Sequence, residues 1–187
     1  MSSRDLVLAA LFAAIIFALG LLPPIMLGFI PVPITAQSLG VMLAGVVLGA
    51  RRGTIAVLLV LLLAAIGLPV LSGGRGGLAV FAAPTTGFLI GWVFAAFVTG
   101  YLSERFVRSS QGAIAQTAGF FVAAVAGGVV VLYLFGITYL AIVSGLGFEK
   151  AFIGSMAFIP GDLVKAGVAA LAGRAVMAGY PLLPARA

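Results

Sequence analysis

The stretch that decides the fold is LVLAALFAAIIFALGLL, residues 6–22, because it contains no charged or hydrogen-bonding side chain. The run without a charged residue continues to residue 50, and a second such run covers residues 109–148. An α-helix of about 20 apolar residues crosses the hydrocarbon core of a bilayer, which is about 30 Å thick. Both runs are long enough for membrane-spanning helices, so the sequence predicts an all-α membrane protein.

The composition of the whole chain agrees with this prediction. Of its 187 residues, 64% are hydrophobic and only 7% are charged, whereas soluble domains carry about 25% charged residues. Glycine is abundant, at 26 residues, and small residues allow membrane helices to pack closely in a compact bundle. The chain has no cysteine and no histidine, which excludes disulfides and metal sites built on those side chains. With four acidic residues and no catalytic or nucleotide-binding motif, we expect neither an enzyme nor a bound cofactor.

Six transmembrane spans fit the pattern of apolar runs and breaks best. Four prolines between residues 23 and 33 end the first span, because proline cannot continue a helix. Arg51-Arg52-Gly53 is interpreted as a short turn between the second and third spans, and a glycine-rich loop over 69–83 follows the third. We expect one integral membrane domain over residues 1–187, with spans at about 5–22, 34–50, 54–68, 84–103, 112–138 and 161–178.

The basic residues predict how these spans are oriented. They lie at span ends and not along one stripe, which argues against nucleic-acid binding despite the net charge of +6. Cytoplasmic loops are enriched in Lys and Arg, so we expect both termini on the cytoplasmic side of the membrane. A seven-span alternative, which splits the run 109–148 into two helices, weakens this bias. In the six-span arrangement only Arg75 and Lys150 are outside, and the inside segments hold Arg4, Arg51, Arg52, Arg105, Arg108, Arg174 and Arg186.

Asp162 and Lys165 are the strongest candidates for a ligand site. They lie three positions apart at the start of the last predicted span and therefore share a helix face. A charged side chain at membrane depth costs about 2.5–3.5 kcal/mol, and such residues usually face the bundle interior and serve a function. Asp162 can accept hydrogen bonds and Lys165 can donate them. The alternative is that the two charges only neutralise each other, with Asp162 also favoured by the helix N-terminus.

Two connecting segments supply further candidates on the same, outward side. The proline-containing segment 28–37 is apolar but cannot be helical, which suits a cavity wall with Gln37 as a neutral hydrogen-bonding group. Gln37 could instead cap the second span. Arg75 lies among four glycines, which favours a mobile loop that closes over a ligand, although a solvated loop charge is equally consistent. Phe29 and Tyr139 are the candidate aromatic contacts.

Small residues spaced four apart form possible helix-packing faces. Ala9 and Ala13 on the first span are one such pair, and Ala10, Ala14 and Ala18 continue the pattern. These faces can pack inside the bundle or dock a partner protein. The pattern is common, so both interpretations stay open for the first span.

Taken together, five segments make the chain resemble the BioY family, the biotin-binding S components of energy-coupling factor (ECF) transporters. The last of them is the most specific. The segments are IPVPITAQSL (30–39), LGARRG (48–53), GLPVLSGGRGGL (67–78), APTTGFLIG (83–91) and FIPGDLVK (158–165). The resemblance implies a six-helix bundle that binds biotin on its outward side and delivers it across the membrane.

The resemblance also implies roles for individual residues and partners. Asp162 and Lys165 would hydrogen-bond the ureido group of biotin, and the loops with Gln37 and Arg75 would close the site. The Ala9/Ala13 region would dock onto a transmembrane coupling subunit, and two cytoplasmic ATPase subunits would drive transport. One departure is the segment 83–88, where the family pattern Gly-Pro-Thr-Gly-Gly-Tyr is Ala-Pro-Thr-Thr-Gly-Phe, so no ligand role is assigned to Thr86 or Phe88.

Two alternative functions remain. The first is an S component for another vitamin. Flavin and thiamine are disfavoured as its ligand, because Phe29 and Tyr139 are the only aromatic side chains expected near the site. A membrane scaffold without transport activity would leave Asp162 and Lys165 as mutual counterions.

Overall fold

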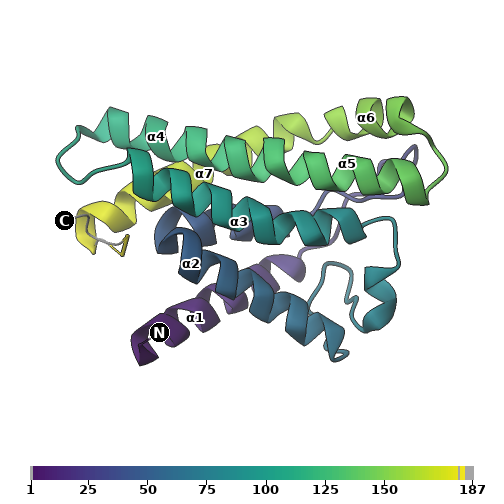
Figure 1. The fold of residues 1–187 in the computed structure, drawn as a ribbon, viewed down its shortest axis with the longest axis horizontal. Helices are drawn as coiled ribbons and strands as arrows, with labels where there is room; N and C mark the ends of the chain where they lie inside the picture. The colour runs from purple at the N-terminus through teal and green to yellow at the C-terminus, as the bar shows by residue number, and fades with distance from the viewer. Residues whose placement is uncertain (1, 181, 184–187) are drawn as a thin grey trace.

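The computed structural model describes residues 2–180, 182 and 183, which form an elongated bundle of helices (Figure 1). Arg186, which was counted among the inside charges, lies outside the described residues. In chain order the elements are α1 (Ser3–Gly20), α2 (Gln37–Ala65), the 3₁₀-helix η1 (Leu78–Phe81), α3 (Thr86–Phe106), α4 (Ala113–Val125), the π-helix η2 (Ala126–Val131), α5 (Leu132–Val143), α6 (Phe148–Met156) and α7 (Ile159–Gly179).

Helix α2 contains both the second and the third predicted span, because the chain reverses inside it. Gly49 has φ 83° and ψ −178°, a conformation that glycine adopts readily. A Cβ added to Gly53 would lie 2.7 Å from the carbonyl oxygen of Ala44, so the second arm of α2 runs back along the first. The turn therefore lies at Gly49, and its predicted position at residues 51–53 was wrong.

Glu104 of α3 explains why the second arm starts directly after Gly49. Its carboxylate accepts a hydrogen bond of 2.8 Å from the backbone N–H of Ala50. Carboxylates are favoured at helix N-termini, where backbone N–H groups lack partners within the helix. A side chain at Gly49 would collide with this carboxylate. The sequence Gly-Ala-Arg-Arg thus restarts a helix at the point where charge alone suggested a loop.

The run 109–148 forms one rod of α4, η2 and α5, and not the two short helices of the seven-span alternative (Figure 1). Gly127 and Gly128 of η2 lie directly against Thr99 of α3 and Met42 of α2, with no room for a side chain. The rod ends at Val143, beyond the predicted end at residue 138. The short helix α6, which the sequence analysis did not predict, leads into α7 at a bend of 53°.

Among the described residues, α1, α2, α3 and the α4–η2–α5 rod are long and apolar enough to cross a membrane, and the bent pair α6–α7 gives a fifth span if it is taken as one. The reversal at Gly49 divides α2 into two arms, which gives the sixth. The prediction of an all-α bundle of six membrane helices is thereby confirmed.

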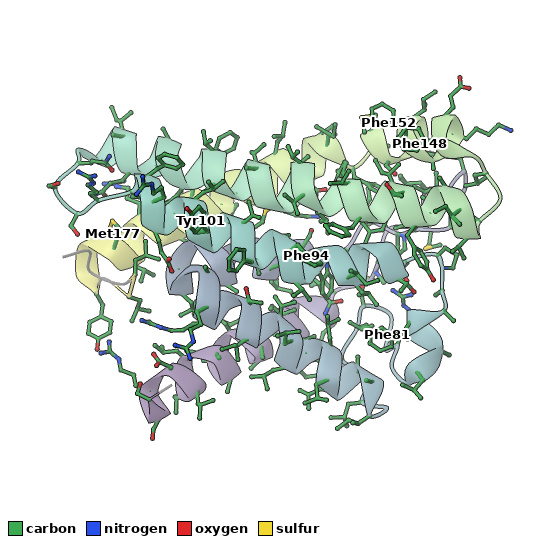
Figure 2. All side chains as sticks on the ribbon, in the orientation of Figure 1. Phe81, Phe94, Tyr101, Phe148, Phe152 and Met177 are labelled. Atoms are coloured by element: carbon green, nitrogen blue, oxygen red, sulfur yellow. The ribbon has the colours of Figure 1, made fainter. Side chains whose placement is uncertain are left out.

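The start of α1 and the end of α7 lie at the same end of the bundle. Arg4 donates a hydrogen bond of 2.8 Å to the hydroxyl of Tyr180, and Arg52 forms an ion pair of 3.1 Å with Asp5. This arrangement requires an even number of crossings. Three aromatic side chains labelled in Figure 2, Phe94, Phe148 and Phe152, are about half exposed, as expected for a surface that faces lipid.

Candidate ligand-binding site

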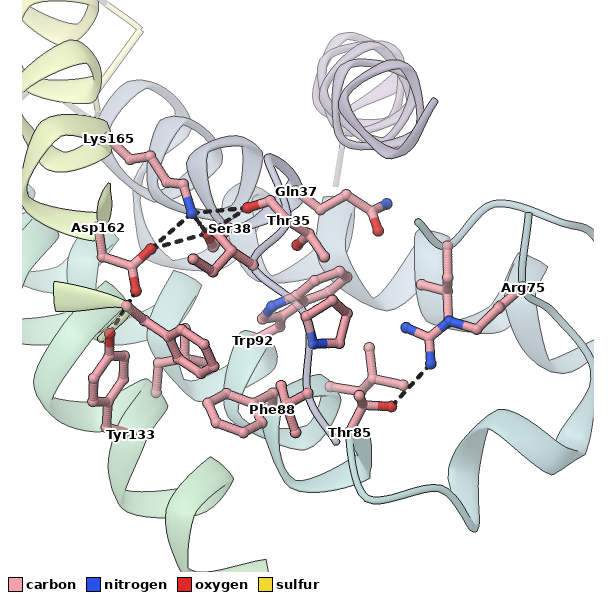
Figure 3. A pocket seen from close by; sticks show the side chains of 17 residues that line it. Thr35, Gln37, Ser38, Arg75, Thr85, Phe88, Trp92, Tyr133, Asp162 and Lys165 are labelled. Atoms are coloured by element: carbon pink, nitrogen blue, oxygen red, sulfur yellow. Dashed lines mark hydrogen bonds and ion pairs between the residues drawn. The ribbon is translucent and has the colours of Figure 1, made fainter. Parts of the chain in front are cut away.

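A cavity with about 600 Å³ of empty space, partly open to solvent, lies near the start of α7. Ligand pockets are mostly apolar with a few placed polar groups, and the lining of this cavity has that character. The polar side chains at this cavity come from segments far apart in the sequence. They are Thr35, Gln37, Ser38, Arg75, Thr85, Tyr133, Asp162 and Lys165 (Figure 3).

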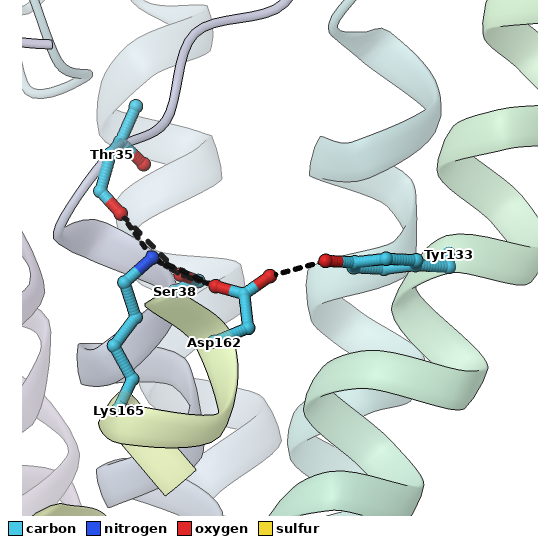
Figure 4. A network of polar contacts seen from close by, with 5 residues as sticks. All are labelled: Thr35, Ser38, Tyr133, Asp162 and Lys165. Atoms are coloured by element: carbon cyan, nitrogen blue, oxygen red, sulfur yellow. Dashed lines mark hydrogen bonds and ion pairs between the residues drawn. The ribbon is translucent and has the colours of Figure 1, made fainter. Parts of the chain in front are cut away.

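Asp162 and Lys165 form the centre of a polar network at one end of the cavity (Figure 4). The Nζ of Lys165 lies 2.8 Å from Oδ1 of Asp162, and it also donates to Ser38 Oγ at 2.9 Å and to the carbonyl oxygen of Thr35 at 2.8 Å. The other carboxylate oxygen, Oδ2 of Asp162, accepts a hydrogen bond of 2.7 Å from the hydroxyl of Tyr133. The network joins α2, α5 and α7.

The local sequence explains why Asp162 points into the bundle. Pro160 lies in the first turn of α7, where its missing N–H costs nothing, and Asp162 lies in the same turn near the positive end of the helix dipole. Asp162 is 4% exposed, so its charge needs the partners that surround it. The bend between α6 and α7 places Phe158 beside it in the cavity wall.

Aromatic side chains form much of the remaining wall. Phe88, Tyr133 and Phe158 pack edge to face, with ring centroids 6.3–6.5 Å apart, and Trp92 of α3 also lines the cavity. The expectation that Phe29 and Tyr139 are the only aromatic side chains near the site was therefore wrong. Phe88, which received no role in the sequence analysis, lies in the wall. The shortage of aromatic side chains therefore no longer argues against flavin or thiamine as the ligand.

Tyr133 is the functional candidate that sequence reasoning missed. It is 6% exposed, and its hydroxyl donates a hydrogen bond to Oδ2 of Asp162. A hydroxyl in the middle of an uncharged membrane run was the available signal, because buried tyrosine hydroxyls usually find a partner. The π-helical turn of η2 directly precedes Leu132 and Tyr133, and such turns often occur next to functional sites.

Gln37 lines the cavity, but its amide group is committed to the backbone. Its Nε2 donates to the carbonyl oxygens of Ile16 and Val70, at 3.1 and 3.0 Å, and its Oε1 accepts from the N–H of Ser72 at 2.7 Å. These bonds tie α1 and the glycine-rich loop to the start of α2. Gln37 is therefore a structural support of the cavity wall in this conformation.

Arg75 lies at the opposite end of the cavity from Asp162 (Figure 3). Its Nε donates to the carbonyl oxygen of Ser72 at 3.1 Å, and its Nη1 donates to Thr85 Oγ1 at 3.2 Å. These bonds use two of the five N–H donors of the guanidinium group. Partial burial lowers the pKa of Arg75, because burial disfavours the charged form, and an incoming anion would favour that form.

Two predicted site residues lie away from the cavity, and two residues of the predicted partner surface serve other contacts. Phe29 is 60% exposed and lies near Gly154 of α6, and Tyr139 packs against Gly87 on the outside of α3 and α5, so neither lines the cavity. Ala9 and Ala13 are 0% and 6% exposed, because this face of α1 packs into the bundle. In this structure they are not accessible to a partner, whereas the neighbouring Ala10, Ala14 and Ala18 are exposed.

Comparison with known proteins identifies the chain. The model of the BioY family matches residues 1–181. The chain belongs to the BioY family. It is 80% identical to the biotin transporter BioY of Rhizobium etli over the full length of both chains, and 53% identical to the biotin transporter BioY of Rhodobacter capsulatus over 92% of this chain and 93% of that one.

A solved structure extends the likeness to BioY proteins from sequence to three dimensions. It is described as the S-component for biotin from an ECF-type ABC transporter, and it matches with a TM-score of 0.90 and 35% identity over 97% of both chains. The resemblance noted from the sequence is thereby confirmed. These BioY relatives are named as transporters and not as enzymes. Among the described residues of this chain, no group of three acidic side chains could hold a metal ion.

Proposed function

We propose that this chain is the substrate-binding subunit of an ECF-type ABC transporter and takes up biotin across the bacterial cytoplasmic membrane. The observation that carries the proposal is the cavity with a buried Asp162–Lys165 pair at one end and Arg75 at the other. The names of the BioY relatives and of the matching solved structure support the same ligand.

The chemistry of biotin suits this cavity from end to end. Its ureido group has two N–H donors and one carbonyl oxygen, its ring system and chain are apolar, and its tail ends in a carboxylate. Asp162 can accept the donors and Lys165 can donate to the carbonyl oxygen. The aromatic wall of Phe88 and Trp92 would enclose the apolar body, and Arg75 would meet the carboxylate with its remaining N–H groups.

Ligand binding at Lys165 must compete with a bond inside the protein. The ammonium group has three N–H donors, and the three oxygens of Thr35, Ser38 and Asp162 use them all. A ureido carbonyl would replace one of these acceptors. Of the three acceptors, the Thr35 carbonyl is the one most like a ureido carbonyl, because it is also a neutral carbonyl oxygen. We infer that a bound ligand replaces it and so releases the segment before α2 from Lys165. Ligand binding would then be coupled to the position of that segment.

The partners follow from the role of S components. The protein would dock onto a transmembrane coupling subunit, and two cytoplasmic ATPase subunits would supply the energy. We place both termini in the cytoplasm and the cavity on the outer side, in accordance with the charge distribution. On α1 we now assign the docking face to the exposed Ala10, Ala14 and Ala18 in place of the buried Ala9 and Ala13.

This docking face can be tested separately from ligand binding. We expect Ala14→Trp to abolish biotin uptake in cells that hold the complete transporter, because the indole would prevent close helix approach. Titration of the purified variant with biotin should give the wild-type result. The matched control is Ala175→Trp, at a position on α7 that is also exposed. Normal uptake by the Ala14 variant would contradict the assignment of this face.

Calorimetric titration of the detergent-purified protein tests the function itself. We expect biotin to bind tightly with a stoichiometry near one, and thiamine and riboflavin to give no heat at the same concentration. Binding of thiamine or riboflavin in place of biotin would support the S component for another vitamin, which the aromatic wall makes chemically reasonable. The scaffold alternative would be supported if the folded protein bound none of these vitamins and the double variant Asp162→Ala, Lys165→Ala still folded and kept the activity of the wild-type protein.

A further inference from the structure

A second hollow lies on the outer surface of the bundle, between α4 and α7 and away from the ligand cavity. It holds about 870 Å³ of empty space, is widely open, and its walls are almost entirely apolar. We call it the α4–α7 groove. The residues that matter below are Ala113, Thr117, Phe121, Gly167, Leu171 and Arg174.

The groove exists because α7 carries no side chain at Gly167. A Cβ added there would meet no atom within 4 Å, so this glycine leaves open space and does not serve close packing. Phe121 on α4 and Leu171 on α7 form the apolar sides. A surface of this kind within the membrane suits an acyl chain, which gains dispersion contacts along an apolar channel.

Arg174 places a positive charge at the same groove. It is exposed and lies within α7, about 18 Å along the helix from Asp162. The two ion pairs among the described residues use Arg52 and Lys165, so neither neutralises Arg174. A cation that faces lipid from a membrane helix extends toward the headgroup region, where an anion can pair with it.

The start of α4 adds to this positive potential. Ala113, the first residue of α4, lines the groove, and the N-cap Gly112 has no side chain to bond the free N–H groups of the first turn. Helix N-termini favour anions for this reason. A guanidinium, an uncapped helix start and an apolar channel thus meet in one groove, and together they match the two parts of an anionic lipid.

We propose that the α4–α7 groove binds one phospholipid with an anionic headgroup. The phosphate pairs with Arg174 beside the first turn of α4, and an acyl chain lies along Phe121 and Gly167. Basic pockets between membrane helices bind anionic headgroups in this way. A second copy of this chain is disfavoured as the occupant, because each copy carries a net charge of +6 and the same unpaired arginine.

Native mass spectrometry of the delipidated protein tests the proposal with two lipids that differ only in headgroup. We expect dioleoylphosphatidylglycerol to bind one copy at a concentration about fivefold or more below that of dioleoylphosphatidylcholine. Arg174→Gln should remove this preference. Gly167→Leu, which fills the groove without changing charge, should weaken the binding of both lipids. Both variants should bind biotin normally, because neither residue lines the ligand cavity.

Matched controls make each outcome decisive. Arg51→Gln removes another exposed arginine, on α2, and Ala18→Leu makes a small-to-large change at an exposed position of α1. Both variants should bind lipid at the wild-type level. Equal binding of the two lipids by the wild-type protein would overturn the proposal. So would an equal loss of preference in Arg51→Gln. A shift from dimer to monomer in Gly167→Leu with unchanged lipid binding would assign the groove to a second copy.

Discussion

Two ion pairs of the described residues, Asp162–Lys165 and Asp5–Arg52, lie at opposite ends of the bundle and differ in burial and in number of partners. Asp162–Lys165 has side chains that are 6% and 15% exposed, and three further oxygens, from Thr35, Ser38 and Tyr133, bond to it. Asp5–Arg52 has side chains that are 26% and 22% exposed. It links α1 to α2 and has two extra bonds: Arg52 donates to the carbonyl oxygen of Leu182 at 3.0 Å, and Asp5 Oδ2 accepts from the N–H of Ser2 at 2.9 Å.

This difference in burial indicates which of the two ion pairs belongs to a functional site. Taking two charges out of water is costly, and apolar residues of the same volume are often as stable as a buried pair. A buried pair beside a cavity is therefore poorly explained by stability, whereas a more exposed pair at a helix end needs no further role. Breaking each pair should then have very different consequences for ligand binding and for the free energy of unfolding.

The largest effect is expected for Asp162→Asn. It leaves the partly buried Lys165 without its counterion, and it keeps only one acceptor oxygen where Tyr133 and Lys165 now use two. We expect biotin affinity to fall by about 100-fold or more, because hydrogen bonds to charged groups are worth about 1.5–3 kcal/mol each. Loss of one member of a buried pair should also lower the free energy of unfolding by about 3–5 kcal/mol. Calorimetry and denaturant unfolding measure the two effects.

A double variant separates the ligand site from general stability. Asp162→Asn combined with Lys165→Met removes both charges, so much of the lost stability should return while biotin binding stays absent. If the double variant bound biotin as tightly as the wild-type protein, the site would lie elsewhere in the bundle.

A smaller effect is expected for Tyr133→Phe, which removes one 2.7 Å hydrogen bond to Asp162 and keeps the ring that packs against Phe88 and Phe158. We expect biotin affinity to fall about tenfold to a hundredfold. Tyr139→Phe is the matched control, because its hydroxyl lies outside the cavity. An equal loss in both variants would mean that the two hydroxyls act through general stability and not through the site.

The fold and the charged part of the candidate site could be predicted because charged residues are rare in this chain. Long uncharged runs predict membrane helices whatever their packing, and Asp162 and Lys165 stand out against an apolar background. The turn was misplaced from Gly49 to residues 51–53, because the two arginines there suggest a loop. The deciding factor was the carboxylate of Glu104, distant in sequence, which allows a helix to start at Ala50.

The aromatic wall and the face of α1 could not be predicted for a different reason. Membrane helices are apolar on every side, so periodicity does not show which side faces the cavity and which faces lipid. Ala9 and Ala10 are chemically identical, yet one is buried and the other exposed, because one position rotates the side chain by about 100°. Phe88 and Tyr139 were misjudged for the same reason.

The smallest effect is expected for Arg52→Gln at the opposite end of the bundle. Exposed ion pairs contribute about 0.2–1 kcal/mol, so the loss of unfolding free energy should stay in that range and shrink in high salt. Biotin affinity should equal that of the wild-type protein, because Arg52 does not line the cavity. Arg51→Gln, an exposed neighbour without a counterion among the two ion pairs, is the control for removal of a positive charge. If Arg52→Gln weakened biotin binding as Asp162→Asn should, the two ends would be coupled, and burial alone would not distinguish the functional pair.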